Sequence, residues 1–392
     1  LDLALGGGFP RGKCSMIYGP ESSGKCHAAG DRVLMFDGTT KAVEDIRLGD
    51  RLMGVDSTPR TVTGIGRGYG PLYRITPVKG GDSFTVNADH VLSLVCTHDQ
   101  GNRKRGDVVN ISLKEYLTKS KDWQVYHHLY RVPVEFPTRD LPLDPYWLGL
   151  WLGDGASRAP AITTQDEEIV DWLQDHADRN GWRLAVYRAD DRCPSYALVG
   201  DVRGNNQPRP VVPLDWLERL NLLRNKHIPH AYKTADREQR LSLLAGLLDS
   251  DGFKGSGSSM GFANTSRRLC DDLIFLARSL GFYASVGRKR TVLNDQQFES
   301  FVVYLSDDFS DVPLLLERKR PEPRRRAGSP LTSRFTVEEV GEGEFYGFEL
   351  DGDHLYLLDS FIVNHNTNLA LLGIAHHQRM WPDLTCAFFD VE

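Results

Sequence analysis

Residues 16–26 read Met-Ile-Tyr-Gly-Pro-Glu-Ser-Ser-Gly-Lys-Cys, a short apolar run that enters a glycine-rich loop. Gly19, Gly24 and Lys25 have the spacing of a phosphate-binding loop, in which backbone N–H groups and the lysine surround phosphate oxygens. Such a loop continues with a serine or threonine hydroxyl that binds magnesium, whereas this chain continues with Cys26. A thiol is a soft ligand that suits Mg²⁺ poorly. The loop is therefore interrupted one residue before it is complete.

The missing hydroxyl occurs near the other end of the chain. Residues 364–371 read Asn-His-Asn-Thr-Asn-Leu-Ala-Leu, and an apolar stretch from Thr367 leads to the strand-like run 384–392. Joining Lys25 to Thr367 gives the order strand, phosphate loop, helix and strand, which is typical of a nucleotide-binding α/β unit. The two ends therefore predict fragments of one P-loop ATPase.

The joined ends resemble the ATPase core of RecA-type recombinases, whose loop also reads GPESSGKT. The resemblance covers residues 1–25 and 367–392. It implies that the joined chain binds ATP and magnesium, that Glu392 orients the attacking water, and that the whole host protein binds DNA and self-assembles. The ATP-binding residues that it implies are Gly19, Pro20, Glu21, Ser22, Ser23, Gly24, Lys25 and Thr367, with Thr367 also binding the magnesium.

The segment between these ends begins at Cys26 and ends at Asn366, and its junction residues can carry out a self-contained acyl transfer. A cysteine thiol can attack its own preceding carbonyl to form a thioester. The hydroxyl of Thr367 can then take over the acyl group, and Asn366 can cyclise to release the insert. None of these steps needs ATP, a metal or another enzyme. The insert thus looks like an intein, and its splicing would leave a native Lys25–Thr367 peptide bond.

Two further stretches resemble intein blocks. In the run 87–90, Asn87 would hold the strained carbonyl and His90 would protonate the leaving amide nitrogen. The run 345–358 resembles the block that places His354 beside the cyclising asparagine, and His365 would polarise the last peptide of the insert. Many inteins carry an acidic residue seven positions before the histidine that corresponds to His354, and this chain has Gly347 there. Whatever that carboxylate does must be supplied otherwise or omitted.

Short alternating apolar runs separated by Asp-Gly, Gly-Asp and Gly-Gly turns predict strands over 26–130 and again over 328–366. The resemblance to inteins implies that the two segments form one all-β splicing (Hint) domain of the horseshoe type. Such a domain would bring the two ends of the insert close together, as ligation of the flanking segments requires.

The region 131–327 has helical periodicity and contains two acidic helix ends, at 147–155 and 244–252, the second reading Leu-Ala-Gly-Leu-Leu-Asp-Ser-Asp-Gly. Both resemble the LAGLIDADG signature of homing endonucleases, with Asp154 and Asp251 at the acidic position. A single such helix is also typical of a capped core helix, but two copies favour an α+β domain with a pseudo-twofold repeat. The resemblance implies Mg²⁺ on both acids and double-stranded DNA as partner, at the uninterrupted host gene.

Composition excludes several classes of protein. The chain has 392 residues, 40% hydrophobic and 26% charged, which predicts two to three globular domains at about 150 residues each. No apolar run reaches the roughly 18 residues of a membrane span and no signal peptide begins the chain, so we expect a soluble cytoplasmic protein without a membrane partner. The six cysteines have no zinc-knuckle or C-x-x-C spacing. The net charge of −6 argues against a uniformly basic nucleic-acid binder. Local basic clusters at 103–105, 288–290 and 318–326 could still contact DNA phosphates. No catalytic lysine is assigned.

Two alternatives stay open. One is a splicing-inactive remnant that only binds or nicks DNA, which the intact set Cys26, His90, His365, Asn366 and Thr367 argues against. The other is a continuous P-loop ATPase with a large accessory domain, which the thiol in place of the magnesium hydroxyl argues against. The predicted organisation is host 1–25, splicing domain 26–130, endonuclease 131–327, splicing domain 328–366 and host 367–392.

Overall fold

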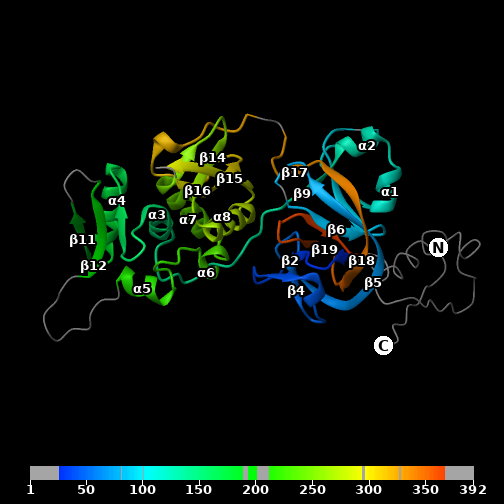
Figure 1. Ribbon diagram of the computed structural model, residues 1–392, viewed down its shortest axis with the longest axis horizontal. Coiled ribbons are helices and arrows are strands. Elements are labelled where there is room, and N and C mark those ends of the chain that lie inside the picture. The colour runs from blue at the N-terminus through cyan, green and yellow to red at the C-terminus, as the bar shows by residue number, and fades with distance from the viewer. Residues whose placement is uncertain are drawn as a thin grey trace, which may run out of the picture.

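The computed structural model describes residues 26–80, 82–99, 101–188, 193–200, 212–293, 296–325 and 328–366. The predicted host segments, with the phosphate loop 19–25, Thr367 and Glu392, lie outside the described residues. The described chain forms a β-rich body and a mixed α/β body that lie side by side (Figure 1). No helix within the described ranges is long and apolar enough to cross a membrane.

The β-rich body combines strands from both ends of the insert. Its two main sheets have the orders β18-β1-β6-β5-β4 and β17-β9-β7-β20-β19, and β8 pairs with β7. The elements are β1 (His27–Ala28), β2 (Arg32–Leu34), β3 (Thr40–Ala42), β4 (Arg51–Met53), β5 (Pro59–Pro77), β6 (Phe84–Asn87), β7 (Val91–Cys96), β8 (Val108–Ser112), α1 (Leu113–Thr118), α2 (Lys121–Tyr126), β9 (His127–Tyr130), β17 (Thr332–Ser333), β18 (Phe335–Leu350), β19 (Leu355–Leu357) and β20 (Val363–His365). Apolar side chains that alternate along these strands form the core of this body.

Both ends of the insert lie in this body. The first strand, β1, pairs with β18 and β6, and the last strand, β20, pairs with β7. Because β6 and β7 are consecutive, the short turn between them connects the upstream junction to the downstream one.

The prediction of an all-β splicing domain is wrong at 113–126, where α1 and α2 follow β8. Each helix begins at a serine whose hydroxyl accepts a hydrogen bond from the third following backbone N–H, Glu115 N to Ser112 and Trp123 N to Ser120. Such capping satisfies a backbone donor that the first helical turn leaves open. These two caps stabilise short helices within an otherwise β-rich stretch.

The mixed α/β body contains the same element order twice. Its elements are α3 (Pro145–Asp154), β10 (Ala161–Thr163), α4 (Glu167–Arg179), β11 (Trp182–Tyr187), β12 (Ser195–Gly200), α5 (Pro213–Arg219), α6 (His230–Lys233), α7 (Arg237–Ser250), β13 (Gly252–Lys254), β14 (Ser259–Asn264), α8 (Arg267–Ser279), β15 (Tyr283–Leu293) and β16 (Gln296–Ser306). The sheet β10-β12-β11 of the first half matches the part β14-β16-β15 of the second-half sheet. This duplication agrees with the repeat in the sequence.

The helices α3 and α7 pack side by side at the centre of this body (Figure 1). Their closest approach is at Gly149 and Gly246: a Cβ on Gly149 would meet the carbonyl oxygen of Leu243, and one on Gly246 would meet that of Tyr146. Only glycine permits this backbone contact. The packing brings the carboxyl ends of the two helices together.

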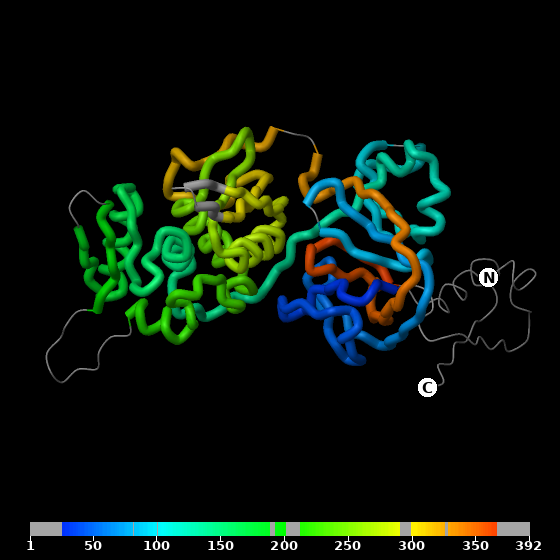
Figure 2. The backbone as a smooth tube through the Cα atoms, in the orientation of Figure 1, coloured from blue at the N-terminus to red at the C-terminus, as the bar shows by residue number. Residues whose placement is uncertain are grey.

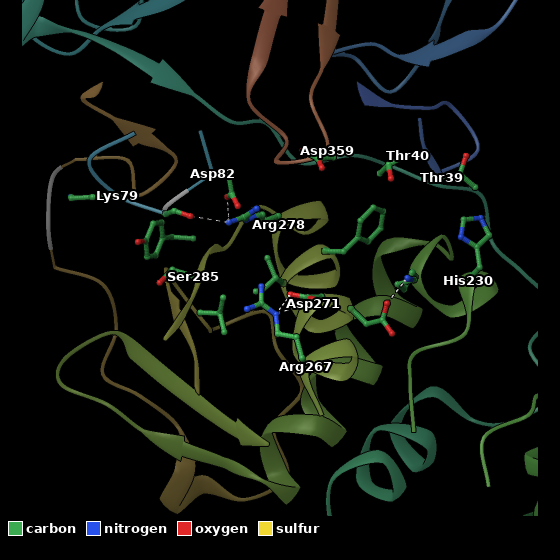
Figure 3. A pocket seen from close by; sticks show the side chains of 18 of the residues that line it. Thr39, Thr40, Lys79, Asp82, His230, Arg267, Asp271, Arg278, Ser285 and Asp359 are labelled. Carbon is green, nitrogen blue, oxygen red and sulfur yellow. Dashed lines mark hydrogen bonds and ion pairs between the residues drawn. The ribbon is translucent and has the colours of Figure 1, made fainter. Parts of the chain in front are cut away.

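The two bodies meet along a charged seam. Arg278 of α8 lies 2.5 Å from the Asp82 carboxylate, which Arg131 approaches to 3.7 Å. Figure 3 shows Arg278 and Asp82 next to each other in the lining of a cavity of about 800 Å³ to which both bodies contribute residues. The connections between the bodies leave the β-rich body at neighbouring strands, because β17 pairs with β9 (Figure 2).

Candidate functional site

The upstream junction is held by Asn87. Cys26 is fully buried at the start of β1. Its backbone N–H donates to the Asn87 side-chain oxygen at 3.2 Å, and its carbonyl accepts from the Asn87 backbone N–H at 3.2 Å. The Lys25 carbonyl, which the sequence assigned to Asn87, lies outside the described residues, so that contact stays a prediction. The structure shows that Asn87 binds the backbone nitrogen of Cys26, which belongs to the peptide bond that the sequence predicts to break.

His90 connects this junction to the downstream one. Its side chain is fully buried, and its Nε2 lies 2.9 Å from the side-chain oxygen of Asn364. Because an amide oxygen only accepts hydrogen bonds, His90 donates from Nε2 in this contact. Asn364 was missed by sequence reasoning. The available signal was strand alternation, which places residue 364 on the same face as Asn366.

The downstream junction brings three predicted residues together. The buried Asn366 donates its backbone N–H to the carbonyl oxygen of His354 at 2.8 Å. The His354 ring is 6.2 Å from that of His365, and its Nδ1 donates to the Leu350 carbonyl at 2.7 Å. This donation leaves Nε2 of His354 as an acceptor when the ring is neutral. The geometry therefore suits a base near Asn366, the role that the sequence predicts for His354.

In the α/β body the two predicted acids lie next to each other, at the ends of α3 and α7. Partial loss of water around the carboxyl group, followed by the negative charge of Asp251, raises the pKa of Asp154 to about 6. Burial also raises the pKa of Asp251. Asn264 donates to Asp251 at 3.2 Å. Asp154 therefore holds its proton up to a higher pH than an isolated aspartate does.

Two lysines that sequence reasoning left unassigned cap the same helix ends. Lys226 donates to the carbonyl oxygens of Gly153 and Gly155 at 2.9 and 2.7 Å. Lys319 donates to the backbone carbonyl oxygens of Asp249 and Ser250 of α7 at 2.8 and 2.5 Å. Burial lowers the pKa of Lys226 to about 8 and also lowers that of Lys319. Each signature helix thus ends in one acid and one partly dehydrated lysine.

Lys319 is held in place by an acid inside the signature. Asp249 is buried and accepts hydrogen bonds from the backbone N–H groups of Leu315 and Leu316 at 2.7 and 3.2 Å, and from the Tyr146 hydroxyl at 2.9 Å. These bonds fix the segment that leads into Lys319. The first signature has Leu152 at the matching position, so the two lysines are positioned differently.

The acid pair fits a divalent cation. Carboxylate oxygens are the ligands that Mg²⁺ prefers, and Mg²⁺ in nucleic-acid enzymes takes one or two carboxylates plus phosphate and water. A cation between Asp154 and Asp251 would offset the negative charges of both carboxylates. No larger group of His, Cys, Asp and Glu with metal-site geometry occurs among the described residues.

Two family models match parts of the chain. A family model described as a homing-endonuclease-associated Hint domain matches residues 26–139, and a homing endonuclease model matches residues 227–310. The chain therefore contains an intein-type Hint domain and a homing endonuclease domain. Both predicted domain types are confirmed.

Several curated proteins and solved structures are similar. The replicative DNA helicase DnaB of Mycobacterium intracellulare is 29% identical over 359 residues, which cover 83% of this chain and 56% of the helicase. The homothallic switching endonuclease of Saccharomyces cerevisiae is 26% identical over 251 residues, 55% of this chain and 42% of that protein. The chain thus spans about half the length of the curated relatives that it matches.

Among solved structures, the homing endonuclease I-DmoI with DNA and Ca is 15% identical with a TM-score of 0.28, covering 42% of this chain and 82% of that one. The gp41-1 intein is 15% identical with a TM-score of 0.17, covering 23% of this chain and 81% of that one.

Proposed function

We propose that the chain is a precursor from which the insert 26–366 splices itself, restoring the phosphate loop of a RecA-type ATPase. The observation that carries this proposal is the β6–β7 turn, which contacts both junctions. Its Asn87 binds Cys26, and its His90 binds Asn364, two residues before Asn366. A short segment that contacts both ends of the insert can couple breakage at one junction to ligation at the other.

The reaction is an internal exchange of acyl bonds. The Cys26 sulfur attacks the Lys25 carbonyl carbon, and the Lys25–Cys26 C–N bond breaks as His90 gives a proton to the leaving nitrogen. The Thr367 hydroxyl then displaces the thiol. The Asn366 side-chain nitrogen attacks its own carbonyl and releases the insert as a succinimide, with His354 and His365 moving the protons. The remaining ester rearranges to the Lys25–Thr367 amide.

Mass spectrometry of the whole chain at neutral pH tests this reaction. We expect a free insert, residues 26–366, and a joined product of 1–25 and 367–392, both absent from the variants Cys26→Ala and Asn366→Ala. His128→Gln, a change in the same domain away from both junctions, is the matched control. A single intact mass from the unmutated chain under reducing conditions would favour the inactive remnant instead.

The RecA-type host rests on the joined sequence GPESSGKT. In the spliced protein, residues 19–25 and Thr367 would bind ATP and magnesium, and Glu392 would orient water. DNA binding and self-assembly belong to the longer host protein. A full-length precursor should gain DNA-stimulated ATP hydrolysis as the joined product appears, and hydrolysis at the same level by Cys26→Ala would contradict this.

We further propose that the insert cuts double-stranded DNA at the uninterrupted host gene. Asp154 and Asp251 would hold Mg²⁺, which when bound neutralises phosphate charge and activates water. Lys226 and Lys319 place positive charge beside the same acids, where a cut phosphate would lie. Their capping bonds keep each ammonium in one position.

Duplexes that carry the joined or the interrupted junction sequence test this second activity. We expect Mg²⁺-dependent cleavage of the joined duplex alone, lost in Asp154→Asn and Asp251→Asn. Cleavage of neither duplex, or of both equally, would refute the proposed target.

A further inference from the structure

His354 adopts an unusual backbone conformation. Its φ is +62°, in the left-handed region that residues other than glycine adopt only rarely. Such conformations persist only where surrounding groups hold them, and they cluster at functional sites. The same residue binds the backbone N–H of Asn366 and carries the ring that the sequence predicts to assist cyclisation. The groups that hold His354 in this conformation are therefore candidates for a role in release of the insert.

The Asp353 carboxylate closes a turn across His354. Its Oδ1 accepts a hydrogen bond from the backbone N–H of Leu355, two residues further along the chain, at 3.1 Å. Aspartate side chains commonly fix tight turns by a bond of this kind. Leu355 in turn pairs with His365 across β19 and β20. One carboxylate oxygen thus fixes both the bend at His354 and the beginning of the hairpin that ends next to Asn366.

Arg60 of β5 holds this carboxylate in place. Its Nε donates to the same Asp353 oxygen at 2.7 Å, and its side chain is only 7% exposed. The other two guanidinium nitrogens donate to the Thr58 hydroxyl and to Asp56, at 2.5 and 3.1 Å. A Cβ on Gly352 would lie 3.3 Å from Cδ and Nε of Arg60, so glycine lets the arginine pass close to the turn. Because all three guanidinium nitrogens have partners, the arginine is a rigid anchor.

We propose that Asp353, anchored by Arg60, is a positioning residue for release of the insert at Asn366, an assignment that rests on the proposed splicing function. The contacts run from Arg60 to Asp353, across the turn at His354, and from the His354 carbonyl oxygen to the Asn366 backbone N–H at 2.8 Å. They hold the predicted base and the asparagine in one relative position. The upstream junction is held by other contacts, those of Asn87. Loss of Asp353 should therefore slow the downstream reaction and spare the upstream one.

The test introduces Asp353→Ala and measures the two junctions of the full chain separately at neutral pH. In the chain with Asn366→Ala and Thr367→Ala, the upstream reaction stops at the thioester, and dithiothreitol releases residues 1–25. With both junctions intact, slow cyclisation leaves residues 1–25 as an ester on Thr367, which hydroxylamine cleaves. We expect conversion of this ester to free insert to slow by about 10-fold or more, while thioester formation stays within about twofold, since misplaced reacting groups lose up to about 100-fold in rate.

Two further variants separate positioning from stability. Asp353→Asn keeps an acceptor oxygen for Leu355 and Arg60, so it should release the insert within about threefold of the parent rate. Asp56→Ala is the matched control, because it removes the other carboxylate from the same guanidinium and leaves the turn at His354 intact. It should follow the parent chain at both junctions.

Equal slowing by Asp56→Ala and Asp353→Ala would show that these acids only support the arginine, and would overturn the assignment. An equal loss at both junctions, no loss at either, or failure of Asp353→Asn to restore the rate would also overturn it. A parent chain that forms neither thioester nor free insert would instead refute the proposed splicing, on which this assignment depends.

Discussion

Alanine at Gly246 should force the two signature helices apart. Its Cβ would meet the Tyr146 carbonyl oxygen and lie 2.9 Å from Leu150 N and 3.0 Å from Gly149 Cα, against 3.4–4 Å for an ordinary contact. All of these atoms are backbone of α3 and cannot rotate away, so the helices must separate by about 1 Å, an overpacking that costs about 1–3 kcal/mol. In an isolated helix the same change would gain about 1 kcal/mol.

The net loss in free energy of unfolding is then up to about 2 kcal/mol, which lowers the melting temperature by up to about 8 °C for a domain of this size. The same separation displaces Asp251 from Asp154. Misplacement of reacting groups by about 1 Å costs about 100-fold in rate, so DNA cleavage should fall by that factor while splicing stays within about twofold.

Calorimetry that resolves the endonuclease transition, together with cleavage of a duplex carrying the joined junction, measures both effects. Gly70→Ala is the matched control, because its Cβ would meet only Phe345 at an ordinary 3.5 Å. An unchanged or higher melting temperature for Gly246→Ala, with unchanged cleavage, would refute the argument that these glycines set the helix contact.

Three other outcomes are expected. Because metal binding needs ionised acids, DNA cleavage should be lost as pH falls through about 6, the raised pKa of Asp154; a pH–rate profile flat from 5 to 8 would contradict this. Lys226→Ala and Lys319→Ala should each leave nicked plasmid, because each lysine caps one signature helix; equal slowing of both strands would argue against separate roles. Asn364→Ala removes the acceptor of His90 Nε2 and should slow thioester formation about 10-fold, given about 1–3 kcal/mol for a buried unsatisfied group; dithiothreitol-induced cleavage at the parent rate would show that this bond is not needed.

Residues whose role depends on position along the chain could be predicted from sequence. Cys26 and Asn366 mark the edges of an interrupted motif, and Asp154 and Asp251 follow signature helices with recognisable spacing. Within the described residues, the structure places Cys26 beside Asn87, and Asp154 beside Asp251. His354 likewise lies beside Asn366. Their chemical roles stay predictions, as do the roles of Thr367 and Glu392.

The supporting residues could not be predicted because the fold alone brings them together. Lys226 lies in a loop without a motif and meets the end of α3 some seventy positions earlier in the chain. Lys319 was one of several bases in a run, and only Asp249 and the helix carbonyls distinguish it. His27 meets the Tyr356 hydroxyl only because the fold brings β19 to β1.

The places where the chain passes between the two bodies show how one domain is inserted into the other. The endonuclease leaves and re-enters the β-rich body between paired strands, β9 and β17, and each body has its own core. Insertion there adds a domain without breaking a sheet. Yet Phe361, at the tip of the β19–β20 hairpin, is fully buried and packs against Phe275 of α8 at 5.2 Å. Because that hairpin lies between His354 and Asn366, contact with α8 stabilises the segment that leads to Asn366. The two candidate sites therefore use separate residues, but the segment that carries Asn366 packs against a helix of the other body.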